Sequence, residues 1–344
     1  MKPCLWPLTQ KRRDDSDTAT RNSSWVRVQG RDTDGVNQRM HEHEVDIDVG
    51  RVRALLSSQC PQFGDASLTL VEPWGTDNAL WRVGDAHVVR LPRIEWATAQ
   101  VDFEAEWLPR LAPHLDVAVP EPLFVGEPGH GYPYQWAIHT WLVGQGAGPT
   151  TIADSVAFAL DLAAVVRQLQ SIDAAPARSP RNRARHLAAY DGETRAAIRA
   201  ASHLIDAPAA TAIWEEALDA APHAGPSVWV HGDLEGNCIT LDGHLSGLVD
   251  WGSACAGDPA VDIQVIWSPL FTDRSRIAFL DALQVDEATV LRSRGAAINQ
   301  ACAALPYYLT TYPLIVERSW HKLAAMGVER HVPAAHGGNE AGGG

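Results

Sequence analysis

The sequence predicts an α+β protein with two lobes, a small β-rich N-terminal lobe and a larger helical C-terminal lobe. Short apolar runs with strand-like alternation gather between residues 67 and 141. Long alanine-rich stretches with helical periodicity follow from residue 152 to residue 326, and one compact β island interrupts them at residues 228–252. With 344 residues, of which 46% are hydrophobic, the chain is long enough to give both lobes a core.

The ends of the chain differ from this pattern. Residues 1–39 are polar and mixed in charge without an apolar period, so we expect a disordered extension or a misassigned start there. Residues 40–143 form the predicted N-lobe and residues 144–332 the helical C-lobe. Residues 333–344 are rich in glycine and are expected to be a flexible tail.

The N-lobe pattern predicts a mostly antiparallel sheet with helices beside it. An amphipathic stretch that begins near Asp46 predicts a helix over about 45–58. The remaining elements are expected strands at 67–74, 79–84, 87–92, 121–126 and 134–141, and a helix at about 95–111.

The C-lobe pattern predicts helices around a single hairpin. The helices are expected at about 152–171, 183–204, 209–221, 274–283, 286–304 and 306–326. Within the β island, the Asp-Gly pair of LDGHL lies between two apolar runs and favours a tight hairpin turn.

Charge is unevenly distributed along the chain. Residues 1–39 carry a net charge of +3 and the remainder −17, so the body of the protein repels phosphate backbones and favours a cationic small molecule over nucleic acid. Solubility alone is the simpler explanation of the acidity. Lysine occurs only at Lys2, Lys11 and Lys322, against 25 arginines. Arginine must therefore take any role that needs a cation inside the body.

Nothing in the sequence indicates a membrane, a disulfide framework or a zinc site. Five cysteines are scattered without CxxC spacing. The first residues lack the apolar core of a secretory signal, and no apolar run is long enough to cross a bilayer. We expect a cytoplasmic protein without a membrane partner.

Three oxygen-bearing side chains are predicted to meet at one edge of the hairpin. Asp233 follows an apolar strand, Asn237 lies four positions on, and Asp250 ends the second hairpin strand. Aspartate and asparagine oxygens suit Mg²⁺, which commonly takes one or two carboxylates and completes its shell with phosphate oxygens and water. A remaining carboxylate can accept the proton of a hydroxyl nucleophile. Ordinary turn chemistry at two strand ends is the simpler alternative.

The segments HGDLEGN, LVDWG and GDPAVD, the last at 257–262, resemble the aminoglycoside phosphotransferase family, which has a protein-kinase-like fold. The resemblance implies that Asp233 is the catalytic base and that Asn237 and Asp250 hold the metal. It also implies that His231 shapes the loop.

In GDPAVD the resemblance implies structural roles for two further aspartates. Asp258 and Asp262 are expected to cap the following helix and to tether the catalytic loop. Contact between Asp262 and the substrate is the alternative.

The resemblance extends over about residues 68–325. WGTDNALWRVG, at 74–84, is similar to a nucleotide loop, with Thr76, Asp77 and Asn78 where protein kinases have glycines. Such a loop implies shielding of the phosphates, and an ordinary hairpin is the alternative. HVVRLPR places Arg90 where a kinase has its strand lysine, with Glu104 as the implied helix partner and Glu106 as the second choice. An arginine at a strand surface is the simpler interpretation.

AIHTWLVGQ, at 137–145, resembles the hinge between kinase lobes. The resemblance implies that backbone groups near His139 to Trp141 read the purine edge, while the His139 side chain is expected to pack.

One departure concerns the catalytic loop. It reads Asp-x-x-x-Asn, one residue shorter than the kinase spacing, and Gly236 is expected to absorb the tighter turn. If it does not, Cys238 takes the usual position of the metal-binding asparagine, although a thiol is a poor ligand for Mg²⁺.

The implied function is transfer of the γ-phosphoryl group of ATP or GTP, with Mg²⁺, to a hydroxyl of a small molecule. An aminoglycoside-like, cationic acceptor is expected first. A macrolide is an alternative, because VVRLPR also resembles macrolide kinases. A metabolite acceptor, as in choline or homoserine kinases, is another. The short loop and the missing lysine leave a nucleotide-binding, pseudokinase-like module as the non-enzymatic alternative.

Two further patterns carry weaker expectations. HEHE at 41–44 is expected to be a solvated charge cluster rather than a metal site. Tyr307, Tyr308, Asp273 and Glu287 are candidates for lining an acceptor pocket, with helix packing as the simpler interpretation.

Overall fold

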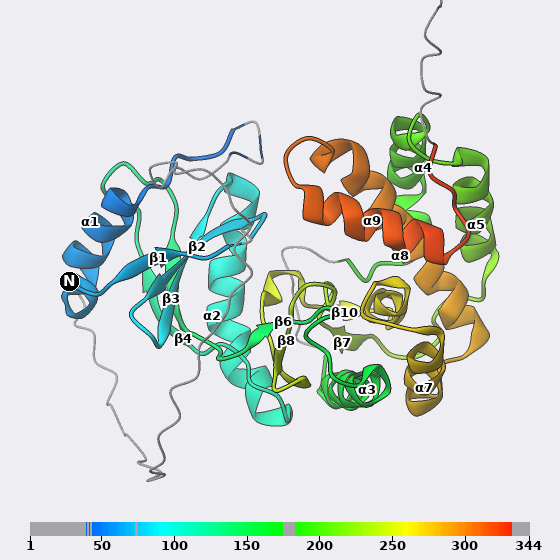
Figure 1. Cartoon of the computed structure of the whole chain (residues 1–344), viewed down its shortest axis with the longest axis horizontal. Helices are drawn as coiled ribbons and strands as arrows, with labels where there is room; N and C mark the ends of the chain where they lie inside the picture. The colour runs from blue at the N-terminus through cyan, green and yellow to red at the C-terminus, as the bar shows by residue number, and fades with distance from the viewer. Residues whose placement is uncertain (1–38, 40, 42, 73–74, 175–182, 332–344) are drawn as a thin grey trace, which may run out of the picture. The chain divides into compact units, whose positions relative to one another are not determined.

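The N-terminal part of the molecule is a five-stranded antiparallel sheet beside a helix (Figure 1). The computed structural model describes residues 39, 41, 43–72, 75–174 and 183–331, so the tail expected at 333–344 and all but Arg39 of the expected extension lie outside the described residues. The strands pair in the order β1 (Leu68–Leu70), β2 (Asn78–Val83), β3 (His87–Pro92), β5 (Trp136–Thr140) and β4 (Pro122–Gly126).

Helix α1 (Val49–Gln59) begins a few residues later than its periodicity suggested. The reason is the cap: the Asp48 side chain accepts a hydrogen bond from the backbone N–H of Arg51 at 2.8 Å and so fixes the first turn. Apolar residues of α1, among them Leu55 and Leu56, share one core with Trp81 and Trp136 of the sheet.

Helix α2 (Ala99–Leu111) packs into the C-terminal core. Phe103, Trp107, Leu108 and Leu111 belong to the large cluster of buried residues formed by the C-terminal helices. The ring of Trp107 lies 5.0 Å from that of Trp229 in β7 (Val228–Val230). The helix that carries Glu104 is therefore held by the C-terminal part of the chain, although its sequence lies in the predicted N-lobe.

Helices make up most of the C-terminal part, as expected. They are α3 (Ser155–Ser171), α4 (Asp191–Ala201), α5 (Ala207–Asp219), α6 (Ala260–Ile263), α7 (Asp273–Leu283), α8 (Glu287–Tyr308) and α9 (Pro313–Ala325). The 3₁₀ turns among the described residues are η1 (Pro61–Phe63), η2 (Glu95–Ala97), η3 (Ala112–His114), η4 (Leu187–Tyr190), η5 (Trp251–Ser253) and η6 (Gln264–Trp267). Among the described residues, no helix is long and apolar enough to cross a membrane.

The β island folds as predicted around its Asp-Gly turn. Strands β8 (Cys238–Leu241) and β9 (His244–Leu248) form a hairpin, with β6 (Gln145–Gly146) paired to the far side of β8. Asp242 and Gly243 both have positive φ, 52° and 86°, which is the conformation of a tight primed turn and explains why this dipeptide predicts it.

Some boundaries differ from the sequence prediction. The first strand ends at Leu70 rather than 74, and the three-residue strand β10 (Cys255–Gly257), which pairs with β7, had no periodic signal. The last two helices were expected to separate at 305, but α8 runs through Pro306 to Tyr308. α9 instead begins at Pro313, because proline suits the first turn of a helix.

Candidate active site

The loop after β7 presents Asp233. Gly232 has φ of +80°, and a Cβ at this position would lie 2.5 Å from the carbonyl oxygen of Ser253. Only glycine fits such a turn without strain. The chain thus leaves the strand sharply, and Asp233 follows with its side chain about one-third exposed.

Asp262 holds this turn from behind. Its two carboxylate oxygens accept hydrogen bonds from the backbone N–H groups of His231 and Gly232, both at 2.8 Å. Burial raises the pKa of Asp262 to about 7, opposed by the two backbone hydrogen bonds and assisted by the nearby charge of Asp233. The structure places Asp262 at the back of the loop, in the tethering position that the resemblance implied.

His231 is buried and packs on Trp251, with ring centroids 4.7 Å apart. Burial lowers its pKa, so the ring is neutral at neutral pH. Its Nε2 lies 3.1 Å from the carbonyl oxygen of Val249 and must carry the proton, which leaves Nδ1 without a partner in the described structure. The hydrogen bond to Val249 and the stacking on Trp251 thus hold the ring of His231 inside the loop.

The catalytic loop closes despite its missing residue. Gly236 has φ of +86° and lies against the guanidinium of Arg318, where a Cβ would collide. Asn237 can then turn back, and its Nδ2 donates to the carbonyl oxygen of Asp233 at 2.7 Å. Cys238 is fully buried in β8 and is not available as a ligand.

Asp250 lies beside Asn237 at the end of β9. The backbone N–H of Val249 donates to the carbonyl oxygen of Asn237 at 2.9 Å, which brings the two segments together. Asp250 itself has a left-handed conformation, with φ of 59°, and its side chain remains 39% exposed. For a residue other than glycine this backbone is strained, and such strain is common where a side chain must be aimed.

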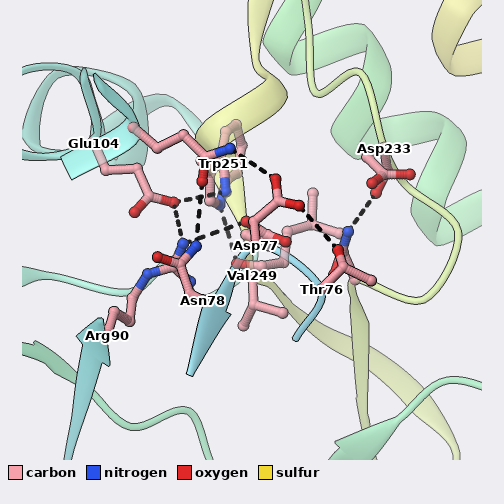
Figure 2. Close-up of polar contacts among 12 residues, drawn as sticks. Thr76, Asp77, Asn78, Arg90, Glu104, Asp233, Val249 and Trp251 are labelled. Atoms are coloured by element: carbon pink, nitrogen blue, oxygen red, sulfur yellow. Dashed lines mark hydrogen bonds and ion pairs between the residues drawn. The ribbon is translucent and has the colours of Figure 1, made fainter. Parts of the chain in front are cut away.

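One guanidinium joins the sheet, helix α2 and the end of the hairpin. Arg90 of β3 donates through Nη2 to Glu104 Oε1 at 3.0 Å and to Asp250 Oδ1 at 3.3 Å. Glu104 Oε1 also accepts from the backbone N–H of Trp251 at 3.0 Å. Figure 2 shows Arg90, Glu104 and Trp251 converging in this way. Three segments distant in sequence are therefore fixed around one buried cation.

Burial and the charge of the partner shift the pKa values of Arg90 and Glu104 in opposite directions. Burial favours the uncharged form of Arg90, but the carboxylates of Glu104 and Asp250 outweigh it and raise the pKa of the guanidinium above its ordinary value. Burial raises the pKa of Glu104 to about 7, against the attraction of Arg90. Glu106, the second choice, lies 53% exposed and pairs with Arg110 on the same helix, away from Arg90.

The three side chains of the nucleotide-loop candidate make hydrogen bonds within the protein (Figure 2). Thr76 Oγ1 donates to Asp77 at 3.0 Å, and Asn78 Nδ2 donates to Gln100 Oε1 at 3.2 Å. Gln100, at the start of α2, donates back to Asp77 Oδ2 at 2.9 Å. The loop is thus attached to the same helix that holds Glu104.

The hinge candidates are placed at the end of β5. His139 is buried, and burial together with the charge of Arg90 lowers its pKa to about 3. The backbone N–H of Trp141 donates to the carbonyl oxygen of Ala86 at 2.8 Å. Within the described structure, Leu142 and Val143 are the first residues beyond β5 whose backbone groups make no hydrogen bond.

Asp258 links the start of α6 to helix α8. Its carboxylate accepts from Arg292 Nε at 2.7 Å and Nη2 at 3.2 Å, and from the backbone N–H of Ala260 at the start of α6 at 3.0 Å. The contact with Arg292 in α8 fixes the segment that leads to Asp262.

Sequence reasoning missed three contacts of the site. Arg183 Nη1 lies 3.1 Å from Asp233 Oδ2. Lys322 of α9 pairs with Glu235 of the catalytic loop at 2.5 Å, with both side chains buried. The only available signal for Arg183 was a run of arginines, RNRAR, in an otherwise acidic body.

The third missed contact is His41, which lies in the segment expected to be a solvated charge cluster. That expectation is wrong for His41 and Glu44, which are buried. His41 Nδ1 lies 2.7 Å from the hydroxyl of Tyr307 in α8, and Nε2 lies 2.9 Å from the carbonyl oxygen of Thr76. Tyr307, an acceptor-pocket candidate, is thereby tied to the nucleotide loop.

The residues present fit a Mg²⁺ ion that takes two ligands from the protein and the others from nucleotide phosphate and water. No group of three histidine, cysteine, aspartate or glutamate side chains gathers for a metal in the part of the chain that is described. Asp250 is 39% exposed, and the Oδ1 of Asn237 accepts no hydrogen bond from a described residue. The backbone hydrogen bond from Val249 to Asn237 makes the segments that carry these two oxygen donors neighbours. Two protein oxygens suit Mg²⁺ when phosphate and water supply the rest.

Comparisons with known proteins agree with this geometry. Residues 70–297 match the phosphotransferase enzyme family (APH). The viomycin phosphotransferase of Streptomyces vinaceus is 49% identical over 55 residues, a match that spans 14% of this chain and 19% of that protein.

Solved structures match over most of their length. A GDP complex of an aminoglycoside 2'-phosphotransferase-IIIa mutant superposes with a TM-score of 0.63 at 17% identity, covering 80% of this chain and 98% of the other. A streptomycin–ATP complex of APH(2")-IIa gives 0.53 at 18% identity, covering 74% and 90%. The macrolide 2'-phosphotransferase MphH of Brachybacterium faecium gives 0.52 at 26% identity, covering 79% and 95%. The fold is therefore the kinase-like α+β fold that the sequence predicted.

Proposed function

Because the chain belongs to the phosphotransferase enzyme family, we propose that it transfers the γ-phosphoryl group of ATP or GTP to a hydroxyl of a small molecule. The observation that carries the proposal is the convergence of Arg90, Glu104 and Asp250 beside the loop of Asp233. This arrangement provides a phosphate-binding cation, an oxygen donor for a metal and, in Asp233, a carboxylate whose Oδ2 pairs with Arg183 and whose Oδ1 is left for an acceptor.

In the proposed reaction the acceptor hydroxyl oxygen attacks the γ-phosphorus, and the bond from that phosphorus to the β–γ bridging oxygen breaks. Asp233 orients the hydroxyl and takes its proton, and the nucleoside diphosphate leaves. Arg90, held by Glu104, binds phosphate oxygens. Asp250 and Asn237 would hold Mg²⁺, which when bound neutralises the negative charge of the phosphates.

The nucleotide base is proposed to lie at the end of β5. Leu142 and Val143 offer backbone groups that are free within the described structure, whereas the N–H of Trp141 is already used. We therefore place the purine-reading groups one or two residues beyond the positions expected from the sequence. The loop of Thr76, Asp77 and Asn78 would cover the phosphates. Because relatives have been solved with GDP and with ATP, both nucleotides belong in the test.

The acceptor is proposed to be a cationic, hydroxyl-bearing antibiotic of the aminoglycoside kind. The net charge of −17 beyond residue 39 supports an amine-bearing molecule. The relatives act on viomycin, aminoglycosides and macrolides according to their names. A macrolide is the second candidate, because the macrolide enzyme shares 26% identity with this chain over 95% of its own length.

The closed catalytic loop supports turnover rather than nucleotide binding alone. Asn237 remains hydrogen-bonded to Asp233 although one residue is missing. We also propose that the protein works in the cytoplasm, where its nucleotide and Mg²⁺ are available.

The test is acceptor-stimulated release of ADP or GDP in the presence of Mg²⁺. Kanamycin, gentamicin, streptomycin, viomycin, macrolides and small amino alcohols are offered in turn. Asp233→Asn and Asp250→Asn are expected to lose stimulated release by at least about 10²-fold. Asp242→Asn is the matched control, because this turn aspartate lies away from the site and asparagine tolerates its positive φ.

Stimulation by an acceptor, lost in Asp233→Asn and Asp250→Asn and kept in Asp242→Asn, supports the proposal and names the acceptor class. Nucleotide binding without release under any condition contradicts it and favours the pseudokinase-like alternative.

A further inference from the structure

We propose that Arg183 is a positioning residue of the phosphoryl-transfer site. It holds the Asp233 carboxylate in the orientation that Asp233 needs to bind the acceptor hydroxyl and take its proton. The inference rests on the proposed function. A single nitrogen, Nη1 of Arg183, lies 3.1 Å from Asp233 Oδ2 and 3.2 Å from the carbonyl oxygen of Gly232. This nitrogen therefore bridges the carboxylate to the backbone of the preceding residue and restricts rotation of the Asp233 side chain.

The catalytic loop has no cation of its own for this purpose. Residues 233–237 read Asp-Leu-Glu-Gly-Asn, so both charges within the loop are negative. Glu235 is already paired with Lys322 from α9. Any positive charge beside Asp233 must come from a distant part of the chain, and Arg183 is fifty residues away in sequence.

The backbone that carries Arg183 is built into the core. Ala184 is buried, and its carbonyl oxygen accepts from the backbone N–H of Asp258 at 3.0 Å. A Cβ on Gly257 would collide with Ala184, so the two segments are in direct contact. The backbone N–H groups of Arg183 and Ala184 also face the thiol of Cys255. These contacts fix the backbone position from which the Arg183 side chain extends toward Asp233.

The charge environment agrees with this placement. Burial disfavours the guanidinium of Arg183, but the carboxylates of Asp233, Asp77 and Asp250 outweigh this effect and raise its pKa. The same cation thus moderates the repulsion among three carboxylates at the reaction centre. A charged hydrogen-bond donor aimed at a carboxylate is both stronger and more directional than a neutral one.

The consequence for the reaction is geometric. With Oδ2 held by Arg183, the other oxygen, Oδ1, has no hydrogen-bond partner among the described residues and is left for the acceptor hydroxyl. Loss of Arg183 allows the carboxylate to rotate, and misplacement of a reacting group by about 1 Å lowers a rate by about 10²-fold. Substrate binding depends little on this orientation.

The test compares Arg183→Ala and Arg183→Lys with the wild type in the acceptor-stimulated assay. Arg183→Ala is expected to lower kcat by about 10²-fold and to change either KM by less than about threefold. Arg183→Lys should recover part of kcat, because one charged nitrogen makes both contacts. Guanidinium ion, at concentrations far below those that unfold proteins, should restore part of the rate to Arg183→Ala and nothing to the wild type.

Arg185→Ala is the matched control. Arg185 lies two residues on, is exposed, and stacks on the ring of Tyr190 at 4.2 Å, so its loss should leave kcat unchanged. Equal kcat in Arg183→Ala and wild type overturns the inference, as does a loss of kcat that neither lysine nor guanidinium restores.

Failure of the proposed function is distinguishable from failure of this inference. If the wild type acts on no acceptor, the proposed function fails. Crystal structures of the wild type and Arg183→Ala then test the positioning role of Arg183 independently of activity. A carboxylate of Asp233 that turns away in the variant supports the positioning role, and an unmoved carboxylate overturns it.

Discussion

Glu104 is the residue whose protonation state most directly affects the proposed phosphate site. Its carboxylate holds both Arg90 and the backbone of Trp251, so it links a side-chain cation to the end of the hairpin. Burial raises its pKa to about 7. Near neutral pH this carboxyl group therefore changes charge, and Arg90 loses one of its two anionic partners when the proton binds.

We expect the KM for the nucleotide to rise as the pH falls from 8 to 6. Protonated Glu104 no longer orients Arg90, and the loss of one charge-assisted hydrogen bond corresponds to about a tenfold change. Glu104→Gln should show a high KM at both pH values, with a flat profile between them. Initial rates at varied nucleotide concentration measure this.

Glu106→Gln provides the control, because Glu106 lies two residues after Glu104, is exposed and pairs with Arg110. A pH-dependent KM that persists unchanged in Glu104→Gln would assign the effect to another group.

At this scale the sequence predicted the motif residues and missed their partners. Asp233 and Asp250 were identifiable because each ends a strand in a recognisable segment, and their neighbourhood follows from the hairpin. Arg183 could not be found in the same way. The sequence predicted a helix over about 183–204, but α4 begins only at Asp191, and Arg183 lies in the irregular segment before it. His41 was misjudged because a polar tetrapeptide next to a polar segment gives no sign of burial.

Helix α9 supports the catalytic loop at the scale of elements. Lys322 reaches Glu235, and Arg318, one helical turn earlier, lies against Gly236. The short loop is thus held by a helix about eighty residues further along the chain. Figure 1 shows α9 beside α8 in the C-terminal part.

Lys322→Met should destabilise the protein by about 3–5 kcal/mol, because it leaves the carboxylate of Glu235 buried without its cation. The double variant Lys322→Met with Glu235→Leu should recover most of that loss, since no buried charge remains. Urea unfolding followed by circular dichroism measures both. His321→Ala, a change at the exposed neighbour, should have little effect. A double variant as unstable as Lys322→Met would contradict the pairing argument.

Long elements were predictable, whereas short ones and their ends were not. Periodicity located helices α3, α5 and α7 and strands β2 and β3 closely, because many residues contribute to each signal, but it started α4 and α9 several residues too early. Strand β10 has three residues and exists because β7 pairs with it, which only the tertiary structure determines. Either Pro306 or Pro313 could have begun the last helix. Pro306 lies inside α8, and Pro313 occupies the first turn of α9.

At the scale of the whole molecule, net charge is the property expected to affect binding of a cationic acceptor. The chain beyond residue 39 carries a net charge of −17, although Arg90 pairs with Asp250 and Arg183 with Asp233. The electrostatic field of this net negative charge concentrates cations near the protein and is weakened by salt.

The KM of a polycationic acceptor should therefore rise with ionic strength, by severalfold between about 50 and 300 mM salt. The KM of an acceptor with a single positive charge should change much less. Initial rates for streptomycin and for a macrolide, each at several salt concentrations, make the comparison. Equal slopes for the two would show that the acidity of the chain serves solubility alone.

The rarity of lysine has a consequence for covalent labelling. Beyond the N-terminal residues the chain has one primary amine on a side chain, that of Lys322, and it lies buried against Glu235 and Gln300. An amine-reactive reagent applied to the folded protein should therefore leave Lys322 unmodified. Modification of Lys322, read by mass spectrometry after a timed pulse, records how often α9 separates from the catalytic loop. Lys322 thus reports on the contact between α9 and the loop of residues 233–237.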